Sequence, residues 1–120
     1  KKKLDVTIWG SGKTIREFLH VDDLARAIVL MLKVKKNKID KICKNKLPFF
    51  NVGSGESITI KNLAILIKKI SRFRGKIFFD RSYPDGTINK NLDSKKISKL
   101  KWKKSIKLSS GLKQIINLRH

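Results

Sequence analysis

Cysteine, histidine, acidic residues and long apolar runs are all scarce in this chain of 120 residues. Its one cysteine, Cys43, has no partner in the chain, which excludes a disulfide framework and a zinc site built on cysteines. The two histidines, His20 and His120, are too few and too isolated to indicate a metal site. No run approaches the roughly 20 apolar residues of a membrane span, and Asp5 interrupts any signal-peptide core after the initial lysines. We therefore expect a cytoplasmic protein with no membrane partner.

The shortage of acidic residues leaves a large positive charge. Thirty Lys+Arg against nine Asp+Glu give a formal net charge of +21. Such a charge attracts phosphates, which makes a basic nucleic-acid-binding module one interpretation. The alternative is a solvated lysine surface. Two features favour it: lysine far outnumbers arginine, which reads bases through bidentate contacts, and most aromatic residues fall inside apolar runs. We therefore do not expect nucleic acid as a partner.

The order of the predicted elements favours an α/β fold. Apolar and polar residues alternate over residues 4–9, which is typical of a strand, and strands that alternate with helices imply a layered α/β structure. In the first half of the chain we also predict a turn over 10–13, an extended segment over 15–21, a helix capped by Asp22 or Asp23 that runs to about Lys33, and a basic mobile loop over 34–47. In the second half we predict a buried strand over 48–55, a helix capped by Thr59 over 60–72, a strand over 76–80, a turn at "YPDGT", and helices over 94–100 and 108–118.

The predicted helix after Asp23 is unusually apolar. From Leu24 to Leu32 only Arg26 is polar, whereas a surface helix carries a polar face. A chain of this length buries one small core and can hardly surround such a helix. Together with a first residue other than methionine, this indicates part of a longer protein.

Two "GSG" motifs, at 10–12 and 53–55, resemble phosphate-binding loops but lack the required spacing. A dinucleotide-binding fingerprint needs a third glycine, which neither motif has. A P-loop ending in "GKT" at 12–14 needs an earlier glycine where the chain has Thr7. We therefore do not expect these glycines to hold a phosphate.

Side chains near the turns could hold a phosphate instead. Trp9 offers a flat ring and Arg16 a planar fork for two oxygens, so together they could hold a nucleotide diphosphate; the alternative is a core tryptophan and an ion pair between Arg16 and Glu17. In "PDGTINK", Asp85 could accept hydrogen bonds from hydroxyls or a base edge, and Lys90 could reach a phosphate. Taken alone, a turn residue and a solvated lysine are the simpler explanations of this pair.

The chain offers no catalytic centre of its own. Asp22 and Asp23 are adjacent, so on a helix their side chains diverge, and helix capping explains them. No serine has a plausible histidine–carboxylate relay. We therefore assign no catalytic residue, no metal ligand and no cofactor-binding residue, and we do not expect these 120 residues to form an enzyme alone.

The string "VTIWGSGKTIREFLHVDDLARAIVLML" resembles the beginning of the C-terminal part of the GDP-L-fucose synthase family. The similarity continues in order through "NVGSGESITIKNLA", "GKIFFDRSYPDGTINKNLD" and "LKWKKSIKLSSGLKQ". Many extended short-chain dehydrogenases/reductases share "REFLHVDD", whereas "WGSG" ahead of the arginine and "PDGT" with a following lysine are more specific. The resemblance implies that residues 1–120 form the C-terminal substrate-binding portion of a reductase of the Rossmann-type superfamily, without its N-terminal NADP-binding domain.

This family converts GDP-4-keto-6-deoxy-D-mannose to GDP-L-fucose by epimerisation and NADPH-dependent reduction, and its cofactor and catalytic residues lie upstream of this segment. The resemblance implies that Trp9, Arg16, Asp85 and Lys90 contact the GDP-sugar, with Arg16 and Lys90 at the diphosphate. It also implies that the apolar helix packs against the cofactor domain. The complete protein would be a homodimer that uses NADPH.

Three positions depart from the family's pattern. Tyr83 stands where a lysine is usual and Asn89 where a basic residue is usual, and both changes remove positive charge beside the expected diphosphate. Lys107 replaces a helix-capping serine, and its charge opposes the dipole of the helix that follows. Three alternatives therefore stay open: another nucleotide-sugar epimerase or dehydratase of the same fold that uses UDP or dTDP, a basic nucleic-acid-binding module, and a truncated frame without activity.

Overall fold

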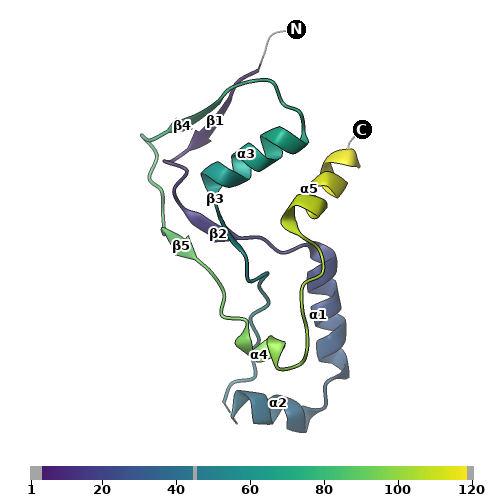
Figure 1. The fold of residues 1–120 in the computed structure, drawn as a ribbon. Helices are drawn as coiled ribbons and strands as arrows, with labels where there is room; N and C mark the ends of the chain where they lie inside the picture. Colours follow the sequence, from purple (N-terminus) through teal and green to yellow (C-terminus); the bar gives the residue numbers. More distant parts are fainter. Residues whose placement is uncertain (1–3, 45, 119–120) are drawn as a thin grey trace.

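The computed structural model describes residues 4–44 and 46–118, and it confirms the α/β prediction. The ribbon is elongated, with β1, β4 and α3 at one end and α2 at the other (Figure 1). Its elements are β1 (Val6–Trp9), β2 (Ile15–Glu17), α1 (Val21–Lys33), α2 (Lys36–Cys43), β3 (Ser57–Thr59), α3 (Ile60–Ile70), β4 (Ile77–Asp80), β5 (Asn89–Lys90), α4 (Lys95–Ser98) and α5 (Leu108–Asn117). No helix in the described ranges has the length and apolar character needed to cross a bilayer.

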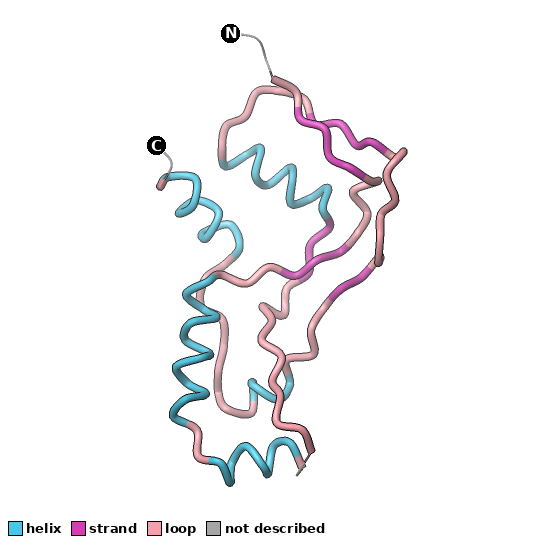
Figure 2. The backbone as a smooth tube through the Cα atoms, turned by 180° about the vertical axis from the view of Figure 1, so that it is seen from behind, coloured by secondary structure: helices cyan, strands magenta, loops and turns pink. Residues whose placement is uncertain are grey.

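The strands form two small sheets. Strand β1 pairs in parallel with β4, with Val6 opposite Ile77, and β2 lies between an antiparallel β3 and a parallel β5. Consecutive strands β1 and β2 therefore belong to different sheets, and the turn over residues 10–14 joins them. This turn and the loop between β4 and β5 lie at the same edge of the molecule (Figure 2).

The start of α1 differs from the prediction. The cap is His20, whose Nδ1 accepts a hydrogen bond from the backbone N–H of Asp22, and neither Asp22 nor Asp23 caps the helix. Asp23 is fully buried and faces a distant segment: its carboxylate accepts hydrogen bonds from the backbone N–H groups of Ser105 (2.9 Å) and Ile106 (3.0 Å), and it pairs with Arg26. This carboxylate therefore fixes α1 against the chain before α5.

Two other predictions are wrong. The basic segment 34–47 is not a loop throughout, because α2 occupies Lys36–Cys43 and buries Cys43 at its end. The apolar stretch over 48–55 forms no strand. It runs as irregular chain beside α4, where the N–H of Gly53 donates to Ser94 Oγ at 2.8 Å. Phe50 and Val52 from this stretch pack against the core.

The later helices and β4 match the prediction closely, whereas the short strands β3 and β5 were not predicted. Thr59 caps α3, with its Oγ1 accepting from the N–H of Asn62 at 3.1 Å. Strand β4 and the short helix α4 form where expected. Helix α5 begins after Lys107, whose side chain makes no capping hydrogen bond, and it packs against α3.

The core is small for a chain of this length. Its centre is Ala27, Ile97 and Trp102, between α1 and α4. The Cα radius of gyration is 18.2 Å, whereas a compact domain of this size has about 14 Å. Helix α1 uses only one face in this core: Leu24, Ile28 and Leu32 lie on the opposite face, where Leu32 is 82% exposed. The structure therefore leaves apolar surface uncovered.

Candidate functional site

The turn between β1 and β2 depends on its glycines for shape. Gly10 and Gly12 have positive φ values of +88° and +74°, which favour glycine. A Cβ on Gly12 would lie 2.5 Å from Phe79 Cε1, and one on Gly10 would lie 2.6 Å from Asp85 Oδ1. The glycines thus let the loop after β4 approach the turn closely.

Asp85 holds this turn through Ser11. The backbone N–H of Ser11 donates to Oδ1 and its Oγ donates to Oδ2, both at 2.6 Å. These two hydrogen bonds, first that of the hydroxyl and then that of the backbone, lower the pKa of Asp85 below its ordinary value, and the charges of Lys13 and Arg81 add to the effect. Asp85 is therefore an ionised carboxylate with cations around it at neutral pH.

Trp9 lies beside the same loop. Its ring stacks on Tyr83, with ring centroids 4.3 Å apart and an interplanar angle of 9°. Trp9 is 69% exposed, so it is not the core tryptophan that the alternative required. Sequence reasoning noted Tyr83 only as a lost positive charge and missed this contact.

Arg16 and Lys90 are neighbours across β2 and β5. The parallel register pairs these two residues, and paired residues of neighbouring strands project from the same face of a sheet. Arg16 Nη1 donates to the carbonyl oxygens of Ile15 (2.7 Å) and Thr87 (2.9 Å). Two cations thus lie side by side, an arrangement that costs free energy unless an anion or solvent screens it.

The ion pair between Arg16 and Glu17 that the alternative explanation required is not formed. Glu17 Oε2 accepts from the N–H of Leu92 at 3.0 Å, and Oε1 accepts from the N–H of Gly55. The carboxylate therefore joins β2 to the second glycine motif and to the chain after β5. Among the described residues, Arg16 forms no ion pair with a carboxylate.

The four predicted site residues thus come from two facing segments, residues 9–17 and 80–90. Besides the backbone pairing of their strands, side-chain contacts join these segments: the ring of Trp9 on Tyr83, Ser11 on Asp85, and Arg16 on the carbonyl of Thr87. An aromatic face, the carboxylate of Asp85 and several cations therefore occupy one exposed edge. Such a set can bind a polar ring compound that carries an anionic group.

Neither glycine motif has the geometry of a dinucleotide-binding turn. In a dinucleotide-binding turn, glycines connect a strand to a helix whose N-terminus faces the pyrophosphate. Here the first "GSG" connects strand β1 to strand β2, and the second precedes strand β3. No metal-binding cluster of histidine, cysteine and carboxylate occurs in residues 4–44 and 46–118, and His120 lies outside those ranges.

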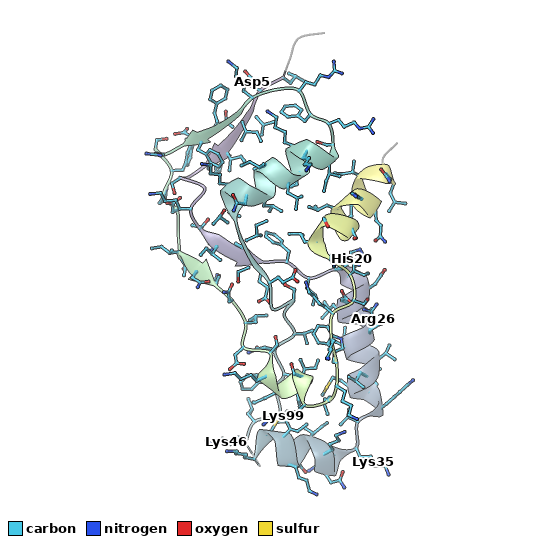
Figure 3. The ribbon with its side chains drawn as sticks, viewed as in Figure 1. Asp5, His20, Arg26, Lys35, Lys46 and Lys99 are labelled. Carbon is cyan, nitrogen blue, oxygen red and sulfur yellow. The ribbon has the colours of Figure 1, made fainter. Side chains whose placement is uncertain are left out.

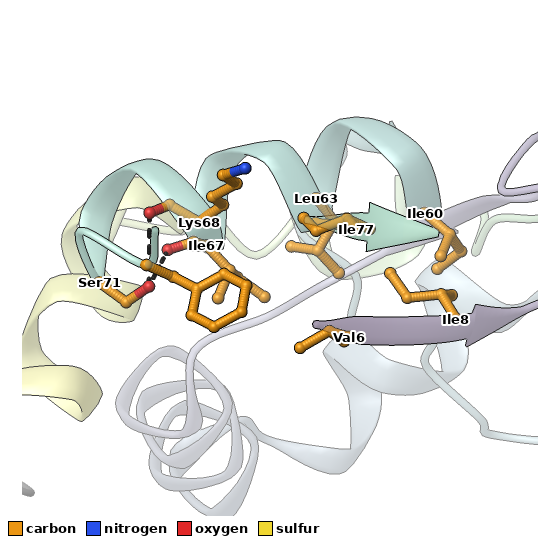
Figure 4. A pocket seen from close by; sticks show the side chains of 10 residues that line it. Val6, Ile8, Ile60, Leu63, Ile67, Lys68, Ser71 and Ile77 are labelled. Carbon is orange, nitrogen blue, oxygen red and sulfur yellow. Dashed lines mark hydrogen bonds between the residues drawn. The ribbon is translucent and has the colours of Figure 1, made fainter. Parts of the chain in front are cut away.

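An apolar cavity of about 370 Å³ lies elsewhere, between α3 and the β1–β4 sheet. Figure 4 shows its walls, which include Val6, Leu63 and Ile77. Its polar groups bond within the chain: Lys68 Nζ donates to the carbonyl of Gly75 at 2.7 Å, and Ser71 Oγ donates to that of Ile67 at 2.8 Å. Both polar side chains that line the cavity are thus bonded within the chain, and the cavity is the apolar space where α3 packs on the β1–β4 sheet.

Comparison with known proteins agrees with this fold. Residues 1–53 match the model of the NAD dependent epimerase/dehydratase family. The chain is 44% identical over 108 residues to "Probable GDP-L-fucose synthase 1" of Oryza sativa subsp. japonica, covering 90% of this chain and 30% of that protein. It is 41% identical over 108 residues to GDP-L-fucose synthase of Escherichia coli (strain K12), covering 90% and 34%. The chain spans about a third of the length of these relatives.

Solved structures show the same relationship. A GDP-6-OMe-4-keto-L-xylo-heptose reductase from C. jejuni superposes with a TM-score of 0.87 at 39% identity over 98% of this chain and 34% of that one. GDP-mannoheptose C4 reductase from Campylobacter jejuni, solved with NADP bound, superposes with a TM-score of 0.80 at 36% identity over 98% and 35%. The chain therefore has the fold of part of an extended short-chain dehydrogenase/reductase, and its resemblance to GDP-L-fucose synthases is confirmed over about nine-tenths of its length.

Proposed function

We propose that this chain, which shares its fold and much of its sequence with GDP-sugar reductases, is the substrate-binding portion of a GDP-L-fucose synthase or a closely similar enzyme. The complete protein would convert GDP-4-keto-6-deoxy-D-mannose to GDP-L-fucose by epimerisation and NADPH-dependent reduction. The observation that carries the proposal is the register that places Arg16 beside Lys90. A diphosphate between these side chains would balance both charges.

Each proposed contact follows from the chemistry of its side chain. Arg16 presents a planar fork to the diphosphate while Lys90 acts as a point charge. Trp9 offers a ring face, and the ionised Asp85 can accept hydrogen bonds from hydroxyls or a base edge with lone pairs that Ser11 does not use. None of these residues transfers a proton or hydride, so their proposed role is to bind and orient the ligand.

The chemistry would come from the rest of the complete protein. When bound there, NADPH supplies the hydride for the reduction. We propose that the NADP-binding domain of the complete protein packs on the uncovered face of α1. On this face Val21, Leu24, Ile28 and Leu32 form an apolar stripe at helical spacing, which the described chain leaves exposed. A homodimer of the complete protein stays a prediction.

A titration of the complete protein tests the substrate assignment. We expect Arg16→Ala to weaken GDP binding more than tenfold, which is about 1.4 kcal/mol, because the variant removes a charge-assisted contact. Arg74→Ala, an exposed arginine between α3 and β4, is the matched control and should bind like the wild type. Unchanged affinity of Arg16→Ala would refute the assignment.

Competition separates the alternatives. GDP should displace a GDP-sugar more effectively than UDP, whereas a UDP-sugar enzyme of the same fold would show the reverse preference. A nucleic-acid-binding module would instead show binding to DNA or RNA that falls steeply with salt and does not change in Arg16→Ala.

A further inference from the structure

The stack of Trp9 on Tyr83 has no role in the contacts proposed so far. The two rings are nearly parallel, 4.3 Å apart and 9° from coplanar. Trp9 is 69% exposed and Tyr83 is 42% exposed, so neither ring belongs to the core. A contact between two exposed rings contributes little to the fold but determines where each ring points.

Hydrogen bonds fix the backbone near both rings. Tyr83 lies between Ser82, whose N–H (3.0 Å) and Oγ (2.6 Å) both donate to Asp80 Oδ1, and Asp85, which Ser11 holds at both carboxylate oxygens. The backbone on each side of Tyr83 is therefore fixed by short hydrogen bonds. Trp9 ends β1 opposite Asp80 of β4, and the N–H of Gly10 donates to the Asp80 carbonyl at 2.8 Å. Its exposed indole, however, has only Tyr83 as a stacking partner among the described residues.

Such a contact matters for binding because an exposed indole otherwise samples several rotamers. Ordering a free side chain when a ligand binds costs affinity, and a neighbour that holds the side chain in its bound orientation removes that cost. Tyr83 covers one face of Trp9 and leaves the rest of the exposed ring available. An uncovered aromatic face is the surface on which a base or the apolar face of a sugar packs.

We propose that Tyr83 is a positioning residue, which holds the indole of Trp9 in the orientation in which its free face receives a ring of the ligand. This inference rests on the proposed function, and it assigns Tyr83 a role through Trp9 without a direct contact to the diphosphate. The ligand it serves is a ring compound linked to a diphosphate. Tyr83 therefore contributes to recognition of the ring, while Arg16 and Lys90 recognise the charge.

The test compares three ligands on the complete protein: pyrophosphate, GDP and GDP-mannose. Tyr83→Leu should weaken the binding of a ring-bearing ligand about fivefold, the size expected for ordering one side chain, and leave pyrophosphate binding unchanged. A loss shared by GDP and GDP-mannose identifies the stacked ring as the base, and a loss confined to GDP-mannose identifies it as the sugar.

Tyr83→Phe keeps the ring and should bind like the wild type. Phe49→Leu changes an exposed aromatic residue in the chain before β3 and is the negative control.

A second measurement needs no ligand. The indole N–H resonance of Trp9, identified by its absence in Trp9→Phe, should show increased fast motion in Tyr83→Leu but not in Tyr83→Phe. The inference is overturned if this resonance keeps its mobility in Tyr83→Leu, or if all three ligands are weakened equally or not at all. If the wild type binds none of the three ligands, the proposed function fails, while the mobility of Trp9 still decides whether Tyr83 positions it.

Discussion

Replacement of Asp23 should destabilise the protein far more than replacement of its neighbour Asp22. The Asp23 side chain is fully buried and accepts hydrogen bonds from two backbone N–H groups, those of Ser105 and Ile106, while it also pairs with Arg26. Asp23→Ala leaves those two donors without an acceptor, at about 1–3 kcal/mol each. It also removes the ion-pair partner of Arg26, but the Arg26 side chain is 47% exposed, so solvent screens its charge and this loss adds little.

We therefore expect Asp23→Ala to lower the free energy of unfolding by about 2–6 kcal/mol, mainly through the two unpaired donors. Asp22 is exposed, so Asp22→Ala should cost less than about 1 kcal/mol, mainly through the helix dipole. Urea unfolding of the complete protein measures both, with the fluorescence of Trp102 as the probe, because Trp102 packs with Ala27 of α1 in the core. Equal losses in the two variants would refute the assignment of Asp23 as the link between α1 and the segment before α5.

Two further predictions concern the turn and the loop of the site. Gly12→Ala should destabilise the protein more than Gly55→Ala: both glycines have positive φ, +74° and +71°, but only at Gly12 does a Cβ meet a neighbour, Phe79, within 4 Å. The positive φ alone costs about 1–2 kcal/mol, so thermal unfolding should show at least that loss for Gly55→Ala and a larger one for Gly12→Ala. The lowered pKa of Asp85 means that its ionised form is favoured by folding, and the stability it contributes is present above its ordinary pKa of 3.8 and is lost as the pH falls through the lowered value. The carboxyl carbon of Asp85 should therefore titrate below 3.8 in an NMR experiment, and Ser11→Ala should move this pKa upward; a pKa at or above the ordinary value in the wild type would contradict the two hydrogen bonds.

The sequence predicted most elements because their signals are local. Thr59 lies directly before an apolar-periodic segment, and the alternation over residues 4–9 is typical of a strand. Helix α2 was missed because lysine and asparagine dominate its composition. A local signal was nevertheless present: Ile39, Ile42 and Cys43 follow the i, i+3, i+4 spacing of a helix face, and they are the residues that α2 turns away from solvent.

Other features depend on partners that are distant in the sequence. Asp23 could have capped its own helix, and only the position of residues 105 and 106 makes it a buried acceptor. The stretch over 48–55 has the composition of a strand, but its backbone bonds to Ser94, directly before α4, and to Lys96 of α4. In the same way, spacing alone could not bring Trp9 and Arg16 to Asp85 and Lys90, because the pairing of β2 with β5 joins segments more than 70 residues apart.

The lysine-rich end of the molecule lies away from this site. Lys35, Lys46 and Lys99 are at the end formed by α2 and α4, while Asp5 marks the opposite end (Figure 3). These lysines contribute to the net charge of +21 from surface that the proposed ligand does not touch. Neutral substitutions of those lysines provide controls for any effect that arises from charge alone.

A double-mutant cycle on Arg16 and Lys90, with pyrophosphate as the ligand of the complete protein, tests directly whether the two cations hold one diphosphate. The cycle compares the dissociation constants of the wild type, Arg16→Ala, Lys90→Ala and the double variant by calorimetry at fixed salt. If both side chains bind the same diphosphate, each single variant should weaken binding, and the two losses should differ from additivity by at least about 0.5 kcal/mol, as is usual for groups that share a partner. Losses that add within error, or single variants that bind pyrophosphate like the wild type, would contradict the placement of the diphosphate between Arg16 and Lys90.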